Sequence, residues 1–179
     1  MKTIPIHFLF ILSILCCRKI QAQDAPAFYS SNLPIVVIST NGVPIPDEPK
    51  ISGTMKIIDN GPGQRNYLVD SGNIYTGNIG IEIRGSYSAS LPQKPYGIET
   101  RDENDSDLNV GLFGWPEESD WVMLANYNDK VFMRNSLAFE LFNETGNYAS
   151  RTKYVEAVVN GAYMGIYVFG EKIKRDNGR

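Results

Sequence analysis

A single lysine stands where the sequence could hold an anion. Lys94 follows a polar, serine-rich stretch that begins at Arg84, and it is in step with Tyr96 and Ile98 on the strand expected next. A lysine in register with inward-facing residues is costly to desolvate unless an anion meets its ammonium group, although a surface lysine can also extend its charge into solvent. The spacing therefore points to a phosphate or a carboxylate beside Lys94, with an ordinary surface lysine as the alternative.

Strands are expected on both sides of this stretch. Between residues 79 and 83, isoleucines alternate with polar or glycine residues, which is the period of a half-buried strand. Apolar, β-branched runs predict further strands at residues 33–40 and 50–59. Residues 101–107 are rich in acids but lack the glycine and the distal glutamate of an EF-hand loop, so we expect a solvated loop there.

One long helix is expected over residues 128–146. Asn128 or Asp129 can cap its beginning, and Gly146 is a natural residue at its end. Apolar residues at helical spacing predict one face packed into the core. The members of this stripe are Met133, Leu137 and Leu141.

A β-hairpin is expected over residues 153–169. Asn160 and Gly161 fit a two-residue type I′ turn. The register that this turn sets places Glu156 opposite Gly165, which leaves space beside the carboxylate. Glu156 is then either a functional carboxylate or an ordinary solvent-facing glutamate. The same register pairs Val159 with Ala162, Ala157 with Met164, and Val155 with Ile166 as one apolar face.

The first 22 residues have the pattern of a secretory signal peptide. Lys2 is followed by an apolar stretch at residues 4–17 and by the small residue Ala22. We therefore expect export to the periplasm, the cell surface or the medium, a short leader at residues 23–32, and no membrane span after the signal is removed.

Signal removal also restricts the chemistry that the protein can perform. The chain has 17 basic and 20 acidic residues, and residues 1–22 hold three of the basic ones, both cysteines and the single histidine. The remaining 14 basic and 20 acidic residues cannot form a Ser-His-Asp or Cys-His centre, a disulfide or a typical zinc site. The acidic balance argues against nucleic acid as the partner.

Four segments in order resemble the CotH kinase family, which is named after a spore-coat protein. They read "LPIVVIST", "RGSYSASLPQKPYGIE", "GLFGWPEESDWVMLANYNDKVFMRNSLAFELF" and "YASRTKYVEAVVNGAYMGIYVFGEKIKRD", and the resemblance covers roughly residues 33–179. It implies a secreted atypical kinase that uses ATP and Mg²⁺ to phosphorylate Ser or Thr of secreted or surface proteins. The alternative is a non-catalytic module for coat assembly or adhesion with the same fold.

The resemblance also implies a fold. It is an α+β domain similar to the small lobe of protein kinases, mostly antiparallel sheet, with one long helix at 128–146 and the hairpin at 153–169. Residues 33–179 would be the N-terminal part of the kinase domain, and the large lobe would be absent. The catalytic residues are therefore expected downstream of Arg179. On this view the full-length protein is an enzyme, and these 179 residues alone are inactive.

The resemblance assigns the nucleotide to the loop and to Lys94. Lys94 would reach the α- and β-phosphates, and Glu140, or Glu144 as the alternative, would hold the lysine in an ion pair. The loop has a single glycine, and Pro95 follows Lys94 directly, so the glycine-rich motif of protein kinases is absent in its usual form. The loop residues expected over the phosphates are Arg84, Gly85, Ser86 and Ser88. Further possible site residues are Asp129, Arg134, Asn135 and Glu171.

Overall fold

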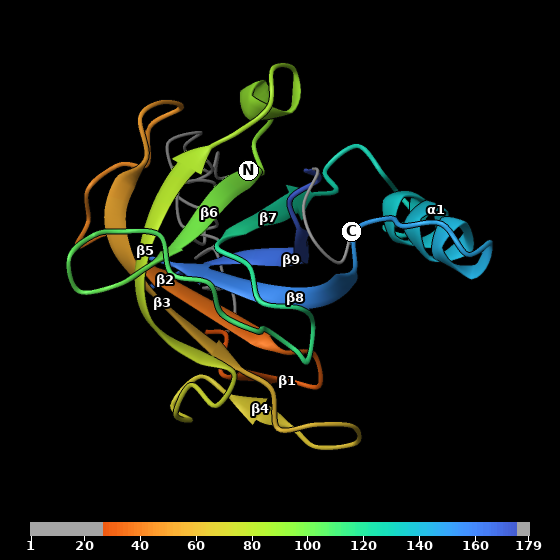
Figure 1. Ribbon diagram of the computed structural model, residues 1–179. Helices are drawn as coiled ribbons and strands as arrows, with labels where there is room; N and C mark the ends of the chain where they lie inside the picture. The colour runs from red at the N-terminus through yellow and green to blue at the C-terminus, as the bar shows by residue number, and fades with distance from the viewer. Residues whose placement is uncertain (1–26, 175–179) are drawn as a thin grey trace, which may run out of the picture.

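The computed structural model describes residues 27–174. The predicted signal peptide at residues 1–22 lies outside the described residues, and so does Arg179, beyond which the catalytic residues are expected. Within residues 27–174, seven strands form a closed barrel in the order β2-β3-β5-β6-β7-β9-β8, and two short strands, β1 and β4, pair beside it (Figure 1). The bounds are β1 Ser30–Ser31, β2 Ile35–Ser39, β3 Ile51–Ile58, β4 Asn66–Tyr67, β5 Tyr75–Ile83, β6 Tyr96–Arg101, β7 Asp120–Ala125, α1 Arg134–Glu144, β8 Thr152–Val159 and β9 Ala162–Glu171, with a 3₁₀ turn at Ser88–Ser90.

The barrel interior is the hydrophobic core. Inward residues alternate along each strand, so that Ile79 and Ile81 of β5 are fully buried, as their spacing predicted. Ile81 pairs with Ile98 of β6, and Ile98 pairs with Trp121 of β7. Burial of such side chains contributes about 1.5–3 kcal/mol each, which is what holds the barrel closed.

The expected kinase-like small lobe is wrong. The chain is mostly β, and its strands close into a barrel because β2 pairs antiparallel with β3 on one side and parallel with β8 on the other. β7, which the sequence analysis did not assign, joins β6 to β9 and completes the ring. Pairing between strands far apart in the chain decided this architecture, and no local sequence pattern reports it.

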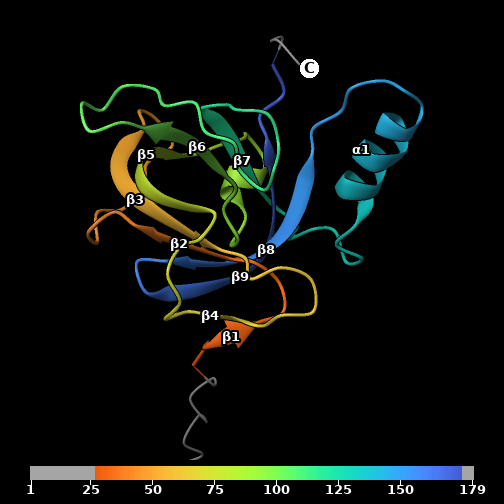
Figure 2. The same cartoon turned by 60° about the horizontal axis from the view of Figure 1, so that its bottom comes forward.

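The helix is shorter than expected and lies outside the core. α1 runs over Arg134–Glu144 rather than 128–146, and it stands beside the barrel near β8 (Figure 2). The predicted core stripe is wrong, because Met133, Leu137 and Leu141 are 49%, 44% and 52% exposed. The barrel fills its interior with residues of its own strands and with Leu112 from the segment between β6 and β7, so the helix has no core to enter.

The ends of α1 carry some of the expected signals. Asp129 accepts hydrogen bonds from the backbone N–H groups of Val131 (3.3 Å) and Arg134 (3.0 Å). Its side chain therefore bonds to the first residue of α1 from five positions earlier, although Met133 occupies the N-cap position itself. Gly146 follows the helix at φ +84°, a left-handed conformation that favours glycine.

The hairpin has the expected turn but a different register. Residues 160–161 have φ values of +49° and +80°, as a type I′ turn requires. A bulge beyond this turn pairs Ala157 with Gly165 and Val155 with Tyr167, one residue further along β9 than expected. Because strand side chains alternate, the bulge brings Tyr167 into the core.

The same shift places Glu156 opposite Ile166 and leaves it nearly buried. Its carboxylate accepts hydrogen bonds from Ser31 Oγ (2.9 Å) and Tyr163 Oη (2.6 Å). Burial raises the pKa of Tyr163, and the hydrogen bond to Glu156 and the negative charge of Glu156 raise it further, to about 12. Glu156 therefore ties β8 to β1 and β9, and it is not a solvent-facing glutamate.

Candidate functional site

Three cavities border α1, and two of them are lined by charged side chains. The front cavity, of about 340 Å³, lies between α1, the loop after β5, and strands β7–β9. The rear cavity, of about 870 Å³, lies between α1, β8 and the loop after β3. The front cavity is lined by Arg84, Val122, Leu124, Asn135, Phe139, Ser150, Thr152, Glu171, Lys172 and Ile173. The rear cavity is lined by Asn32, Leu33, Pro34, Asp59, Gly61, Pro62, Gly63, Ser136, Glu140, Asn143, Glu144, Ser150, Arg151, Thr152, Lys153 and Tyr154.

The front cavity brings together three of the residues expected from the sequence. Arg84 comes from the loop after β5, Asn135 from the first turn of α1, and Glu171 from the end of β9. They are separated by 51 and 36 positions in the chain, and the barrel makes them neighbours. This convergence of polar side chains on one cavity makes it the candidate functional site.

Arg84 is held in place by its backbone. Its N–H donates to the carbonyl of Pro95 at 3.0 Å, which closes the base of the loop. Gly85 follows at φ +88°, and a Cβ there would come within 2.3 Å of Ser88 Oγ. A glycine is therefore required for the chain to turn directly after Arg84.

Glu171 is a buried acceptor at the wall of the cavity. It is 1% exposed, and it accepts hydrogen bonds from Arg151 Nη1 (2.9 Å) and the Arg151 backbone N–H (2.9 Å). Tyr148 Oη donates a third hydrogen bond to it at 3.3 Å. The charge of Glu171 is thus compensated, so we assign it to shaping this wall.

Lys172 lines the same cavity and pairs with Asp120 at 3.1 Å. Lys174 also approaches Asp120, at 3.0 Å. Burial would raise the pKa of the Asp120 carboxyl, but the two lysines outweigh burial, and the net shift is downward. In the described part of the chain no carboxylate forms an ion pair with Arg84, so Arg84 supplies positive charge to the cavity.

The remaining walls of the front cavity are mostly apolar, with hydroxyl groups from Ser150 and Thr152. Val122 and Leu124 come from β7 and Phe139 from α1. A neighbouring cavity of about 370 Å³ shares Phe139, Ser150 and Ile173 with it and is otherwise almost entirely apolar. The Arg84 guanidinium beside extended apolar walls suits a ligand with an anionic group and a flat, uncharged ring system.

The other expected site residues lie elsewhere. Lys94 Nζ donates to the carbonyl of Ala89 at 2.7 Å, which folds the lysine onto its own loop. Glu140 and Glu144 line the rear cavity, and the described residues show no ion pair between Lys94 and Glu140. Neither cavity is lined by Gly85, Ser86, Ser88, Asp129 or Arg134, and the last two form an ion pair at 3.5 Å.

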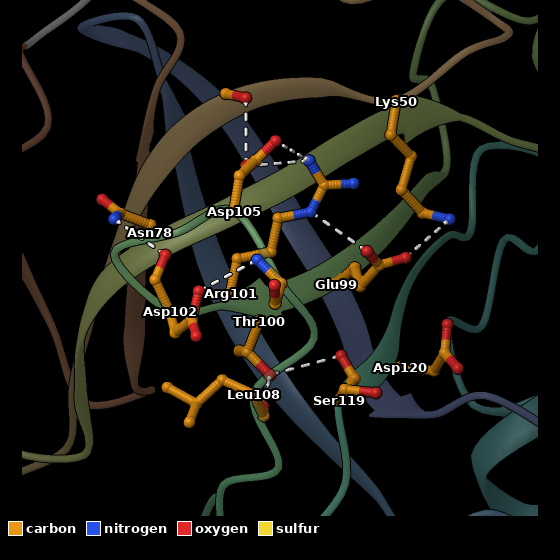
Figure 3. A network of polar contacts seen from close by, with 12 residues as sticks. Lys50, Asn78, Glu99, Thr100, Arg101, Asp102, Asp105, Leu108, Ser119 and Asp120 are labelled. Atoms are coloured by element: carbon orange, nitrogen blue, oxygen red, sulfur yellow. Dashed lines mark hydrogen bonds and ion pairs between the residues drawn. The ribbon is translucent and has the colours of Figure 1, made fainter.

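A second polar cluster lies on the outer surface of β3, β5 and β6 (Figure 3). Glu99 pairs with Lys50 at 3.2 Å and with Arg101 at 3.0 Å, and Arg101 also binds Asp105. Burial lowers the pKa of Lys50. The hydrogen bond to Glu99 and the negative charge of Glu99 outweigh this effect, so the net shift of the Lys50 pKa is upward. Because its charges compensate one another, this cluster fixes the acidic loop expected at residues 101–107 rather than offering a free charge to a ligand.

Sequence reasoning missed the apolar walls and Ser150. Val122 and Leu124 lie in "DWVMLA", whose short continuous run of large apolar residues could have predicted a buried strand. Ser150 has no comparable signal, because it borders both cavities only through the placement of α1 against β8.

Residues 27–174 hold no evident metal site. No group of three or more His, Cys, Asp or Glu side chains in this part of the chain is placed to hold a metal ion. Among the same residues, no helix is both long and apolar enough to cross a membrane.

The fold and the front cavity define a small β-barrel domain with a partly polar cavity beside α1. The family model described as CotH kinase protein matches residues 81–178, which is more than half of the chain. The chain therefore belongs to the CotH kinase family, and the match includes the last three of the four sequence segments that indicated it. Comparison with curated proteins gave no match.

Proposed function

We propose that the front cavity binds the nucleotide of a CotH-type phosphotransferase. The observation that carries this proposal is the convergence of Arg84, Asn135 and Glu171 on one cavity with apolar walls. Membership of a kinase family supports a phosphate donor as the ligand class. The reaction of such an enzyme moves the γ-phosphoryl group of ATP to a hydroxyl group of Ser or Thr.

Each group in the cavity has a task in this proposal. The Arg84 guanidinium binds phosphate oxygens, because its planar donors match their geometry. Val122, Leu124 and Phe139 pack against the base, and Asn135 offers an amide for a polar edge of the ligand. Glu171 shapes the wall of the front cavity, and its charge is compensated by Arg151. Mg²⁺ enters with the nucleotide, since this ion is commonly held by phosphate oxygens and water together with one or two carboxylates.

Lys94 remains a proposed phosphate ligand from the sequence. Its ammonium group would exchange the Ala89 carbonyl for a phosphate oxygen. In protein that transfers phosphate, Lys94→Ala should lower turnover by about 10- to 1000-fold, because such a contact matters most in the transition state. We also propose that secreted or surface proteins accept the phosphate, and that the signal peptide directs export of the protein.

The test is Mg-ATP binding by the purified chain, measured by calorimetry. Arg84→Gln should weaken binding about 10-fold or more, because a charge-assisted hydrogen bond contributes about 1.5–3 kcal/mol. Arg65→Gln is the matched control, since Arg65 is exposed, binds Ser30 and lines neither cavity. Equal ATP affinity in the two variants would refute the assignment of the front cavity.

A second function, the non-catalytic interaction module, is favoured by one observation. Large apolar side chains are exposed on or just before α1. They belong to Val131, Phe132, Met133, Leu137, Leu141 and Phe142. The binding assay separates the two functions, because a module without catalysis has no need to bind Mg-ATP.

The position of the catalytic residues also stays a prediction. If they lie downstream of Arg179, residues 23–179 alone should transfer no phosphate. A radiolabelled transfer assay with a mixed Ser/Thr substrate tests this, and robust magnesium-dependent transfer by residues 23–179 would place the catalytic groups before Arg179 instead.

A further inference from the structure

The rear cavity has features that the proposed nucleotide site does not use. Its volume exceeds that of the two other cavities described beside α1, and its lining mixes carboxylates, hydroxyls and the apolar residues Leu33 and Pro34. Its volume of about 870 Å³ falls within the range of small-molecule sites.

The charges in this cavity leave a negative surplus. Lys153 Nζ binds Asp59 at 2.7 Å, and Arg151 binds Glu171, so both cations are already paired with carboxylates. Glu140 and Glu144 also line the cavity, and the described residues offer neither of them an ion pair. These two carboxylates are one helical turn apart on α1, a spacing of about 5–6 Å between Cβ atoms.

Two hydroxyl groups point to a ligand independently of the charges. Ser150 is 3% exposed, and its Oγ has no hydrogen-bond partner among residues 27–174. The Oγ of Ser136 is also buried and lacks a partner within the same described range. Both residues line the rear cavity, and Ser150 borders the front cavity as well. A buried hydroxyl without a partner is costly, so a polar ligand group that bonds to it gains free energy.

We propose that the rear cavity binds a ligand with primary ammonium groups, such as a linear aliphatic diamine. An ammonium group has three donors and no acceptor, which matches two carboxylates and two hydroxyl oxygens. The aliphatic chain of the ligand lies along Leu33 and Pro34. The same ammonium chemistry is present in lysine side chains of a protein, and the experiment below distinguishes the two sources.

The experiment measures binding of butane-1,4-diamine to the purified chain by calorimetry at low salt, without nucleotide. Butylamine, which has one ammonium group, should bind at least about 5-fold more weakly, because it can reach only one carboxylate. A short peptide with two lysines is the second probe. Tighter binding of the diamine assigns the site to a free ligand, and tighter binding of the peptide assigns it to a protein partner.

Two variants test the residues. Glu140→Gln with Glu144→Gln should weaken diamine binding about 10-fold, whereas Glu103→Gln with Glu117→Gln, which removes the same charge from exposed positions elsewhere, should not. Ser150→Ala should weaken binding about 3-fold or more without lowering the melting temperature, since it removes only a hydroxyl that has no partner among the described residues.

Failure of both probes to bind, or equal loss in the two double variants, would overturn the proposal. The measurement contains no nucleotide, so this outcome is distinct from failure of the front cavity to bind ATP.

Discussion

The placement of α1 outside the core gives the sharpest test of the fold. Leu137→Ala should change stability little, because 44% of Leu137 is already exposed and α1 has no buried residue. Full burial of a leucine contributes about 1.5–3 kcal/mol, and Leu137 has only about half of this contribution to lose. Alanine has a higher helix propensity than leucine and offsets part of the loss, so the free energy of unfolding should fall by about 1 kcal/mol. For a chain of this size the melting temperature should fall by about 2–4 °C.

Ile98→Ala is the comparison variant. Ile98 is 1% exposed inside the barrel, and its truncation leaves a cavity, so the loss should be about 2–5 kcal/mol. Urea unfolding followed by tryptophan fluorescence measures both, because Trp121 lies in the core beside Ile98. If Leu137→Ala lowered the free energy of unfolding by more than about 2 kcal/mol, close to the loss for Ile98→Ala, the exposed position of the helix would be refuted. The apolar face of the helix would then pack in the core, as its spacing predicted.

Two further predictions concern carboxylates that hold strands together. Glu171→Gln should cost about 1–3 kcal/mol in urea unfolding, because an amide cannot accept all the hydrogen bonds that Arg151 and Tyr148 donate to the carboxylate; a change below about 0.5 kcal/mol would contradict this. Tyr163→Phe should cost about 1–2 kcal/mol near pH 7, because it removes the 2.6 Å hydrogen bond to Glu156. The pKa of Tyr163 is raised to about 12 by folding, so this contribution is present in full below about pH 10 and is lost as the pH rises from about 10 to about 12. The stability difference between wild type and Tyr163→Phe should therefore shrink over that window, and a constant difference would count against the Glu156 contact.

The sequence by itself located most of the local structure. The isoleucine alternation at residues 79–83 and the Asn160-Gly161 turn each depend on only a few neighbouring residues, and both are confirmed. The family was also readable from ordered segments, because the family match covers residues 81–178. Arg84 was identified by its place in the loop, and it lines the front cavity.

The tertiary structure decided the architecture and the membership of the cavities. Whether β2 pairs with β8 depends on contacts between residues about 120 positions apart, which have no local signature. Once those contacts close the barrel, its own strands fill the core and α1 is left outside, although its apolar spacing alone predicts burial. A single bulge between Ala157 and Val158 then turned Tyr167 inward, since a shift of one residue exchanges the two faces of a strand.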